Sequence, residues 1–232
     1  FALSFTNQID PDLALLPNKG KSISISPTQG AKLKEITEIN SFSKVIEDRV
    51  VFTFGDKQLV ATLKAVEDNY TNTVGISNFI VAGNWLQPHS NDAVIGNGIA
   101  NTLAAGMYSN DKILEVIAMK PGKGIITSPT DGYVQLPLFN SGIYSLNNID
   151  TDNKYVYTNL KVGQDLFNFK EDEVSKIEFS LKDSKYESVV TQKITKIFGE
   201  NITLKNRSQL NESLYKMLKT ESLAIYLIFT LI

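Results

Sequence analysis

Apolar residues follow strand and helix periods in two stretches near opposite ends of the chain. In the first, "KSISISP" over residues 21–27 alternates like a β-strand. The following "GAKLKEITEI" places Leu33, Ile36 and Ile39 on one helical face, and "SKVIEDRVVFTFG" returns to the strand period. The second stretch repeats this order, with "VSKIEFSLK" and "NITLKN" as strands around the helix "YESVVTQKITKIFG", which Gly199 closes. Two such βαβ-like units predict one shared sheet with helices on one face.

The chain between these units is richer in Gly, Asn and Pro and predicts mainly short strands. Its strand-like segments are "QLVATLKAVE", "DKILEVIAM", "LFNSGIYSL" and "NKYVYTNL", and its helical ones are "GNGIANTLAAG" and "LKVGQDLFN". The predicted fold class is therefore α+β. Residues 1–56 and 174–222 form a split α/β lobe of two βαβ-like units, and residues 57–173 form an inserted, mainly β lobe.

One connection in the inserted lobe is unusually long. "MKPGKGIITSPTDGYVQLPLF", from Met119 to Phe139, holds three of the chain's seven prolines and three of its fourteen glycines. An economical hairpin needs roughly two to five connecting residues, so this length indicates function or disorder. Its apolar residues are poor choices for a flexible linker, and its prolines stiffen it. We predict a protruding hairpin over residues 120–138, with a disordered segment as the alternative.

Both ends of the chain suggest an excised part of a longer protein. The sequence begins with Phe1 instead of Met, and no signal-peptide pattern follows Phe1. At the other end, residues from Leu223 to Ile232 would be apolar on every side of a helix. A membrane span needs about 20 apolar residues, so this run supplies roughly half. It predicts either a buried terminal helix or the first turns of a transmembrane helix.

Composition and motifs argue against several classes of function. The net charge of -2 gives no basic excess for nucleic acid, and the absence of cysteine excludes thiol chemistry. The single histidine, His89, has no second histidine with which to share a metal. Acidic clusters around Asp12, Asp152 and Glu171 lack the pattern of a calcium loop and predict solvated turns. The segment "KPGKGIITS" lacks the glycine spacing of a phosphate-binding loop. From these observations together we predict no catalytic residues, no metal and no cofactor.

Two blocks of the inserted lobe match a known family. The matching positions are Ile95, Gly96, Ile99, Ala100, Leu103, Asp111, Val116, Phe139, Gly142, Ile143, Tyr144, Asp152, Tyr155, Val156, Tyr157, Leu160, Gln164 and Leu166. On these residues the chain resembles the extracytoplasmic domain of Lol-type, lipoprotein-releasing ABC transporter permeases, a domain shared more broadly with macrolide-export permeases. The likeness continues through "KNRSQLNESLYKMLKTESLAIYLIF", where such permeases enter a transmembrane helix, so it implies that residues 223–232 begin one.

This resemblance implies a porter-like α/β lobe with an inserted β lobe, in the periplasm of a Gram-negative bacterium and anchored in the inner membrane. The implied function is non-catalytic: to bind lipoprotein substrates, help extract them from the membrane and hand them to a periplasmic chaperone. The implied partners are that chaperone, a second permease subunit and a separate cytoplasmic ATPase. The alternative is a macrolide- or peptide-export permease that docks an adaptor protein. A third reading is an enzyme that uses Ser141 or His89. It would need a base and an orienting acid, and the sequence does not indicate either one.

The long connection occupies the place where chaperone-recruiting Lol-type permeases carry a proline-containing hook. The resemblance therefore implies a chaperone-binding role for its apolar and proline residues. The predicted binding residues are Ile125, Ile126, Pro129, Thr130 and Tyr133. A paralogue's loop that binds no chaperone is the alternative.

Overall fold

The computed structural model describes residues 9–107, 112–120, 132–210 and 212. Its main element is a ten-stranded sheet in the order β12-β1-β11-β3-β4-β9-β6-β8-β5, with β7 pairing with both β3 and β8. The strands are β1 (Leu13–Pro17), β3 (Ile39–Phe54), β4 (Lys57–Val66), β5 (Ile80–Gly83), β6 (Asp92–Gly96), β7 (Leu114–Met119), β8 (Tyr133–Tyr144), β9 (Tyr155–Asn159), β11 (Lys176–Leu181) and β12 (Ile202–Asn206). The short strands β2 (Ile23–Ser24) and β10 (Glu173–Val174) pair separately. The mixed α+β class is as predicted.

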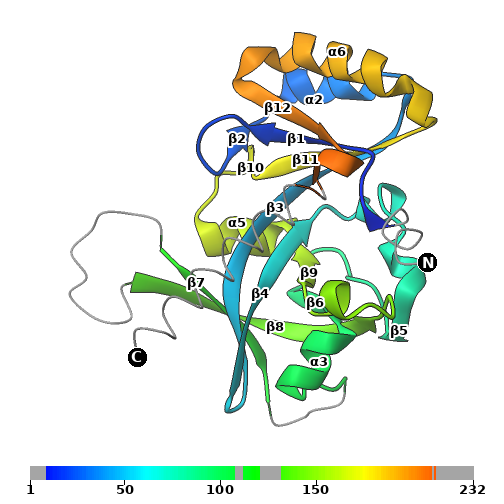
Figure 1. Cartoon of the computed structure of the whole chain (residues 1–232). Coiled ribbons are helices and arrows are strands. Elements are labelled where there is room, and N and C mark those ends of the chain that lie inside the picture. The colour runs from blue at the N-terminus through cyan, green and yellow to red at the C-terminus, as the bar shows by residue number, and fades with distance from the viewer. Residues whose placement is uncertain (1–8, 108–111, 121–131, 211, 213–232) are drawn as a thin grey trace, which may run out of the picture.

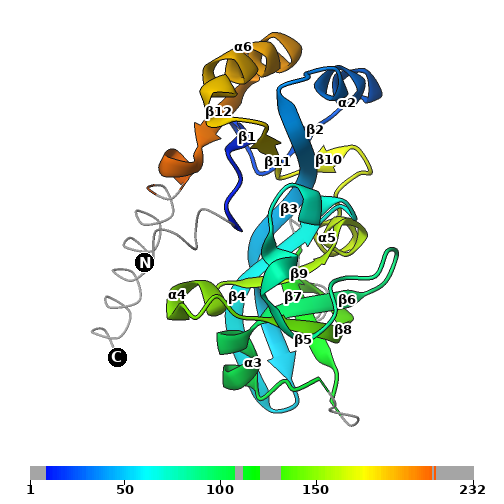
Figure 2. The same cartoon turned by 90° about the vertical axis from the view of Figure 1, so that its right-hand side faces the viewer.

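Helices cover the sheet in two groups. The α-helices are α2 (Pro27–Lys34), α3 (Asn97–Leu103), α4 (Ile149–Asp152), α5 (Leu160–Phe167) and α6 (Glu187–Phe198), and the 3₁₀ turns are η1 (Tyr70–Asn72), η2 (Ile76–Phe79), η4 (Ser184–Tyr186) and η5 (Gly199–Asn201). Figure 1 shows α2 and α6 together above β12, β1 and β11, whereas α3 and α5 lie near opposite ends of the lower strands. In Figure 2, where the molecule is turned by 90°, α2 and α6 again lie together at the top, and α3 and α5 lie below them.

The upper part of the molecule is an open antiparallel sheet. Strand β1 pairs with β12 and β11, and β11 pairs with the first half of β3. We call these strands with α2 and α6 the open-sheet lobe. It joins the two ends of the described chain, because β3 comes from the first predicted unit, and β11 and β12 from the second. Strand β1 lies before the first predicted unit and was not predicted. Gly199 ends α6 with a φ of +73°, a conformation that glycine adopts readily.

The lower part is a closed barrel. The pairings run from β3 to β4, β9, β6, β8, β7 and back to β3, so six strands form a complete circuit. We call this circuit, with α3, α4 and α5, the barrel lobe. Closure leaves no unpaired edge among those six strands except where a strand extends beyond its neighbour. Aliphatic side chains such as Ile46, Leu63 and Val156 fill the main core, which continues into the open-sheet lobe.

Strand β3 belongs to both lobes. Its residues from Ile39 to Val45 pair with β11, and those from Val51 to Phe54 pair with β7. Along its other side, β3 pairs with β4 from Val45 onward. A rigid, hydrogen-bonded strand therefore connects the two lobes.

Three sequence-based element boundaries are wrong. The strand predicted over residues 21–27 is reduced to β2, because Ser26 caps a helix that starts at Pro27. That helix ends at Lys34, so Ile39 belongs to β3 and not to the predicted helical face. Strand β8 begins at Tyr133, so the second half of the predicted connection is paired strand.

The predicted terminal helix lies mostly outside the described residues. Residues 207–210 are helical, and residues 213–232, which include the predicted transmembrane start at 223–232, are not described. Within the described ranges, no helix has the length and hydropathy to cross a membrane.

Candidate functional site

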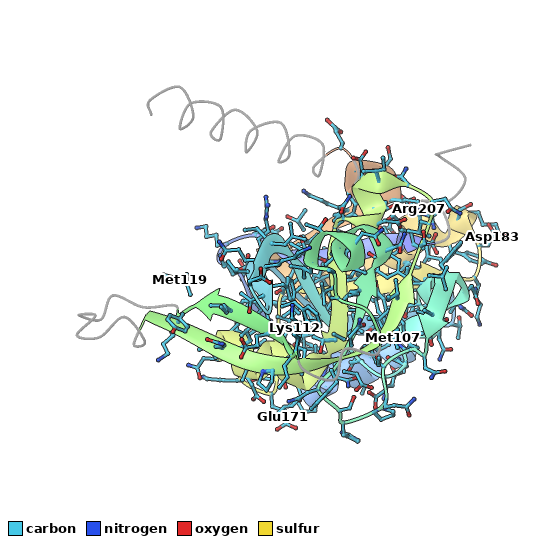
Figure 3. The ribbon with its side chains drawn as sticks, turned by 90° about the horizontal axis from the view of Figure 1, so that it is seen from below. Met107, Lys112, Met119, Glu171, Asp183 and Arg207 are labelled. Atoms are coloured by element: carbon cyan, nitrogen blue, oxygen red, sulfur yellow. The ribbon has the colours of Figure 1, made fainter. Side chains whose placement is uncertain are left out.

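Strands β7 and β8 form a hairpin that extends away from the barrel (Figure 1). Their register runs from Leu114 opposite Leu138 to Met119 opposite Tyr133. Beyond Met119, the Lys120 amide still donates to the Gly132 carbonyl at 2.9 Å. Buried Leu114, Val116 and Ala118 attach β7 to the core, whereas the Met119 side chain is 74% exposed. Figure 3 shows Met119 at the described end of the hairpin, across the molecule from Asp183.

Four of the five predicted chaperone-binding residues belong to the connection between β7 and β8, and the fifth, Tyr133, belongs to β8. Ile125, Ile126, Pro129 and Thr130 lie outside the described residues. Tyr133 is the first residue of β8 and partly exposed, so the structure places it on a paired strand instead of in the loop. The structure therefore describes the base that would carry the predicted binding residues.

A hollow of about 720 Å³ lies at the base of the hairpin. Its wall combines the outer end of β7 with β1, β3 and the end of α5. The lining includes Leu16, Arg49, Met119, Lys120, Phe167 and Phe169. Glu47 and Asp48 also line it, so its wall combines apolar side chains with charges of both signs.

A second feature, missed from the sequence, is a buried cluster of charges where the lobes meet. The ammonium groups of Lys64 on β4 and Lys176 on β11 each lie 2.9 Å from the carboxylate of Glu178. Lys176 also contacts Glu47 on β3 at 2.6 Å. The Tyr70 hydroxyl donates to the other oxygen of Glu178 at 2.8 Å. These side chains tie β3, β4 and β11 to η1.

The cluster is electrostatically self-consistent. Burial alone would raise the pKa of Glu178, but the ammonium groups of Lys176 and Lys64 override it and lower that pKa to about 2. Glu47 is held below its ordinary pKa in the same way, against its own burial. Burial and the Glu178 carboxylate raise the pKa of Tyr70, so its hydroxyl remains a donor. Because these side chains keep one another ionised, Glu47 and Glu178 do not exchange protons near neutral pH. Their ion pairs connect neighbouring strands.

Two of the acidic turns predicted to be solvated are structural instead. Asp152 is buried, and its carboxylate accepts from the Ser145 hydroxyl and the Leu146 amide, both at 2.8 Å. Asp12 accepts from the Leu181 amide at 2.7 Å and pairs with Arg207 at 2.8 Å. The prediction for Asp12 failed because its partners Leu181 and Arg207 are distant in sequence. The partners of Asp152 are local, six and seven residues before it, and the turn that brings them together buries the carboxylate.

The remaining candidates bring no catalytic set together. His89 lies in an exposed loop with a φ of +58° and lines a polar hollow between α2 and α5. The Ser141 hydroxyl donates to the Ala93 carbonyl at 3.2 Å. Among the described residues, no group of three or more His, Asp or Glu side chains is placed to hold a metal ion.

The fold has known counterparts, although no protein-family model and no curated protein matches the sequence. The solved structures that share it include domains of bacterial ABC-type transport proteins that lie outside the cytoplasm. The periplasmic region of MacB from Actinobacillus actinomycetemcomitans superposes with a TM-score of 0.58 at 12% identity, over 90% of this chain and 95% of that one.

Two further structures share the fold. The extracellular domain of the noncanonic ABC-type transporter YknZ from Gram-positive bacteria gives a TM-score of 0.57 at 11% identity, over 84% of this chain and 99% of that one. A domain assigned to a permease protein from Porphyromonas gingivalis gives a TM-score of 0.51 at 11% identity, over 88% of this chain and 93% of that one. At these identities the likeness shows the fold.

Proposed function

We propose that this chain is the extracytoplasmic domain of an ABC transporter permease, where it binds partners and transmits movement without catalysis. One observation carries the proposal: β3 connects the open-sheet lobe directly to the projecting β7–β8 hairpin. The buried cluster around Glu178 fixes β3, β4 and β11 to one another at this junction. Movement of one lobe would therefore reach the hairpin through a hydrogen-bonded strand. The fold shared with MacB and YknZ supports the same class.

In this proposal the energy comes from a separate cytoplasmic ATPase, which acts through membrane helices on this domain and on a second permease subunit. The test is purification of the full-length protein from detergent-solubilised membranes. We expect an ABC ATPase subunit to co-purify at a fixed ratio, with ATPase activity in the complex. Recovery of the full-length protein without any ATPase, after mild solubilisation and crosslinking, would overturn the proposal.

For the particular transport task, we propose lipoprotein release from the inner membrane to a periplasmic chaperone. The support is the β7–β8 hairpin, whose paired strands project from the barrel. Ordering the base in advance reduces the entropy lost on docking, and a few apolar side chains can then supply most of the affinity. The proposed contacts are Ile125, Ile126, Pro129, Thr130 and Tyr133.

The hairpin test compares a deletion with a control variant. Removing residues 123–130 and joining the ends with a short Gly-containing turn leaves the pairing from Leu114–Leu138 to Met119–Tyr133 intact. We expect this variant to lose capture of the periplasmic lipoprotein chaperone while keeping its melting temperature. The matched control replaces the exposed residues Pro88 and His89, which lie in a loop outside the hairpin, with glycine. Chaperone capture at the original affinity by the hairpin deletion would contradict the assignment.

The alternative task is to dock an adaptor protein in macrolide or peptide export. It would use the same two lobes and the same β7–β8 hairpin. The fold shared with MacB favours it as the second candidate. A pull-down with a periplasmic adaptor in place of the chaperone distinguishes the two. Adaptor capture without chaperone capture would support export.

A further inference from the structure

A separate pocket of about 520 Å³ lies on the sheet surface where the two lobes meet. Both lobes contribute to its wall: β1, β11 and β12 from the open-sheet lobe, and β4 and the α4 turn from the barrel lobe. Val60 and Ile149 line it, although they are 50% and 80% exposed. These two side chains place exposed aliphatic surface directly beside the charged groups of the pocket.

Lys154 supplies the charge that distinguishes this pocket. The turn that carries it is fixed, because the Lys154 amide donates to the Thr151 carbonyl and its carbonyl accepts from the Thr62 amide. Its ammonium lies 4.3 Å from the centroid of the Tyr155 ring. Lys64 and Lys176 each pair with buried glutamates, whereas Lys154 forms no ion pair with any described carboxylate.

Charged groups of both signs surround Lys154, but none of the described carboxylates lies within ion-pair distance of its ammonium. The charged and titratable groups that face it are Glu47 on β3, Lys64 on β4, Tyr155 on β9, Lys176 on β11 and Asp10 before β1. Arg49, Asp48, Asp150 and Lys205 complete the charged wall. Glu47 and Glu178 are already matched by Lys64 and Lys176. Burial lowers the pKa of Lys154 to about 8, with Glu47 opposing and the two other lysines adding to the effect.

We propose that this pocket binds an anionic amphiphile, with its head group on the ammonium of Lys154 and its apolar chain along Val60 and Ile149. An anionic head would supply the counter-charge that Lys154 lacks in a partly dehydrated site, where such a pair is stronger than in water. The aliphatic wall would take the chain out of water. A lysine whose charged form is penalised by burial is also typical of binding sites. The proposal rests on this pocket and is independent of the transport task.

The test measures binding to the 232-residue chain by isothermal titration calorimetry, with probes below their micelle concentrations. Decane sulfonate supplies an anionic head and a chain, decyl maltoside an uncharged head, and inorganic sulfate an anion alone. We expect one molecule of decane sulfonate to bind and the other two to bind at least about tenfold more weakly. If decyl maltoside binds as tightly as decane sulfonate, the pocket is only an apolar surface. If sulfate binds as tightly as decane sulfonate, the pocket is a simple anion site. Either result would overturn the proposal.

Three variants connect the binding to Lys154. Lys154→Met should weaken decane sulfonate binding about tenfold or more, the effect of removing a charged hydrogen-bond donor. Lys154→Arg should retain most of the affinity, and Lys161→Met, on an exposed ion pair with Asp165, should change nothing. Affinity should also fall as the pH rises from 7 to about 9.5, because Lys154 loses its proton, and Lys154→Met should not show that fall. An unchanged affinity in folded Lys154→Met would overturn the assignment.

Discussion

The ammonium of Lys64 lies 2.9 Å from the carboxylate of Glu178, and both side chains are almost entirely buried. Lys64 also stands directly opposite Glu47 in the β3–β4 register. Glu178 lies on β11, which pairs with the other side of β3. One lysine on a barrel strand is therefore held by a carboxylate from the open-sheet lobe. This contact therefore connects the two lobes at their junction.

Removing one member of this cluster should strongly destabilise the fold. Lys64→Met leaves Glu178 with one cation fewer in a buried site, which costs about 3 to 5 kcal/mol in comparable cases. Lys161→Met, which breaks the exposed Lys161–Asp165 pair, should change the free energy of unfolding by at most about 0.5 kcal/mol. Urea unfolding at pH 7 measures both. Similar stabilities for the two variants would contradict a structural role for the cluster.

The same cluster predicts sensitivity to acid. The pKa of Glu178 is lowered from 4.5 to about 2 in the folded protein, because Lys176 and Lys64 outweigh its burial. The unfolded chain therefore binds the proton first as the pH falls. Stability from this group is complete above about pH 6 and is lost between about pH 5 and 2, on the order of 3 kcal/mol in all.

Urea unfolding at a series of pH values checks this window. The wild-type free energy of unfolding should fall as the pH decreases below 5. Glu178→Gln should be less stable at pH 7 but lose less of its stability over that window. A wild-type profile that stays flat down to pH 3 would be incompatible with the ionised cluster.

A matched pair of glycines tests the packing of α5 on the barrel. A Cβ atom added at Gly163 would lie 2.6 Å from the Ala65 Cβ and 3.2 Å from the Ile46 Cβ, so Gly163→Ala should cost about 1 to 3 kcal/mol. A Cβ atom added at Gly30 in α2 would meet nothing within 4 Å. Gly30→Ala should therefore stabilise the protein by up to about 1 kcal/mol through helix propensity. Thermal unfolding distinguishes them, and a stabilising Gly163→Ala would show that α5 packs elsewhere.

The regular elements could be predicted because their local pattern agrees with their final environment. Strand β3 and helix α6 keep a clear apolar period, and Gly199 ends α6 as predicted. The start of α2 at Pro27 was missed although its signal was present: Ser26 and Gln29 form a capping box, with Pro27 at the first helical position. The start of β8 at Tyr133 was missed because prolines favoured a loop.

The buried cluster was beyond local reasoning. Lys64 and Glu178 each sit within an apolar strand pattern, where a charged residue normally indicates the solvent face. Here both faces of the sheet are covered, since Tyr70, Val74 and Ile76 pack on the outer face of β3 and β4. The signal that could have found it is a pair of opposite charges inside two strands that are otherwise apolar on both faces. Their partnership depends on the strand order, which brings together residues more than a hundred positions apart.

In the proposed function, this domain faces away from the cytoplasm in a transport complex. The chain has no cysteine, so a single introduced cysteine in a full-length protein cleared of any others gives an unambiguous signal. Lys161→Cys places the thiol where the native side chain is 74% exposed, and Val94→Cys places it in the core as the control. A membrane-impermeant maleimide added to intact spheroplasts should label the first variant and leave the second unlabelled. Labelling of Lys161→Cys that requires lysis of the spheroplasts would contradict the account.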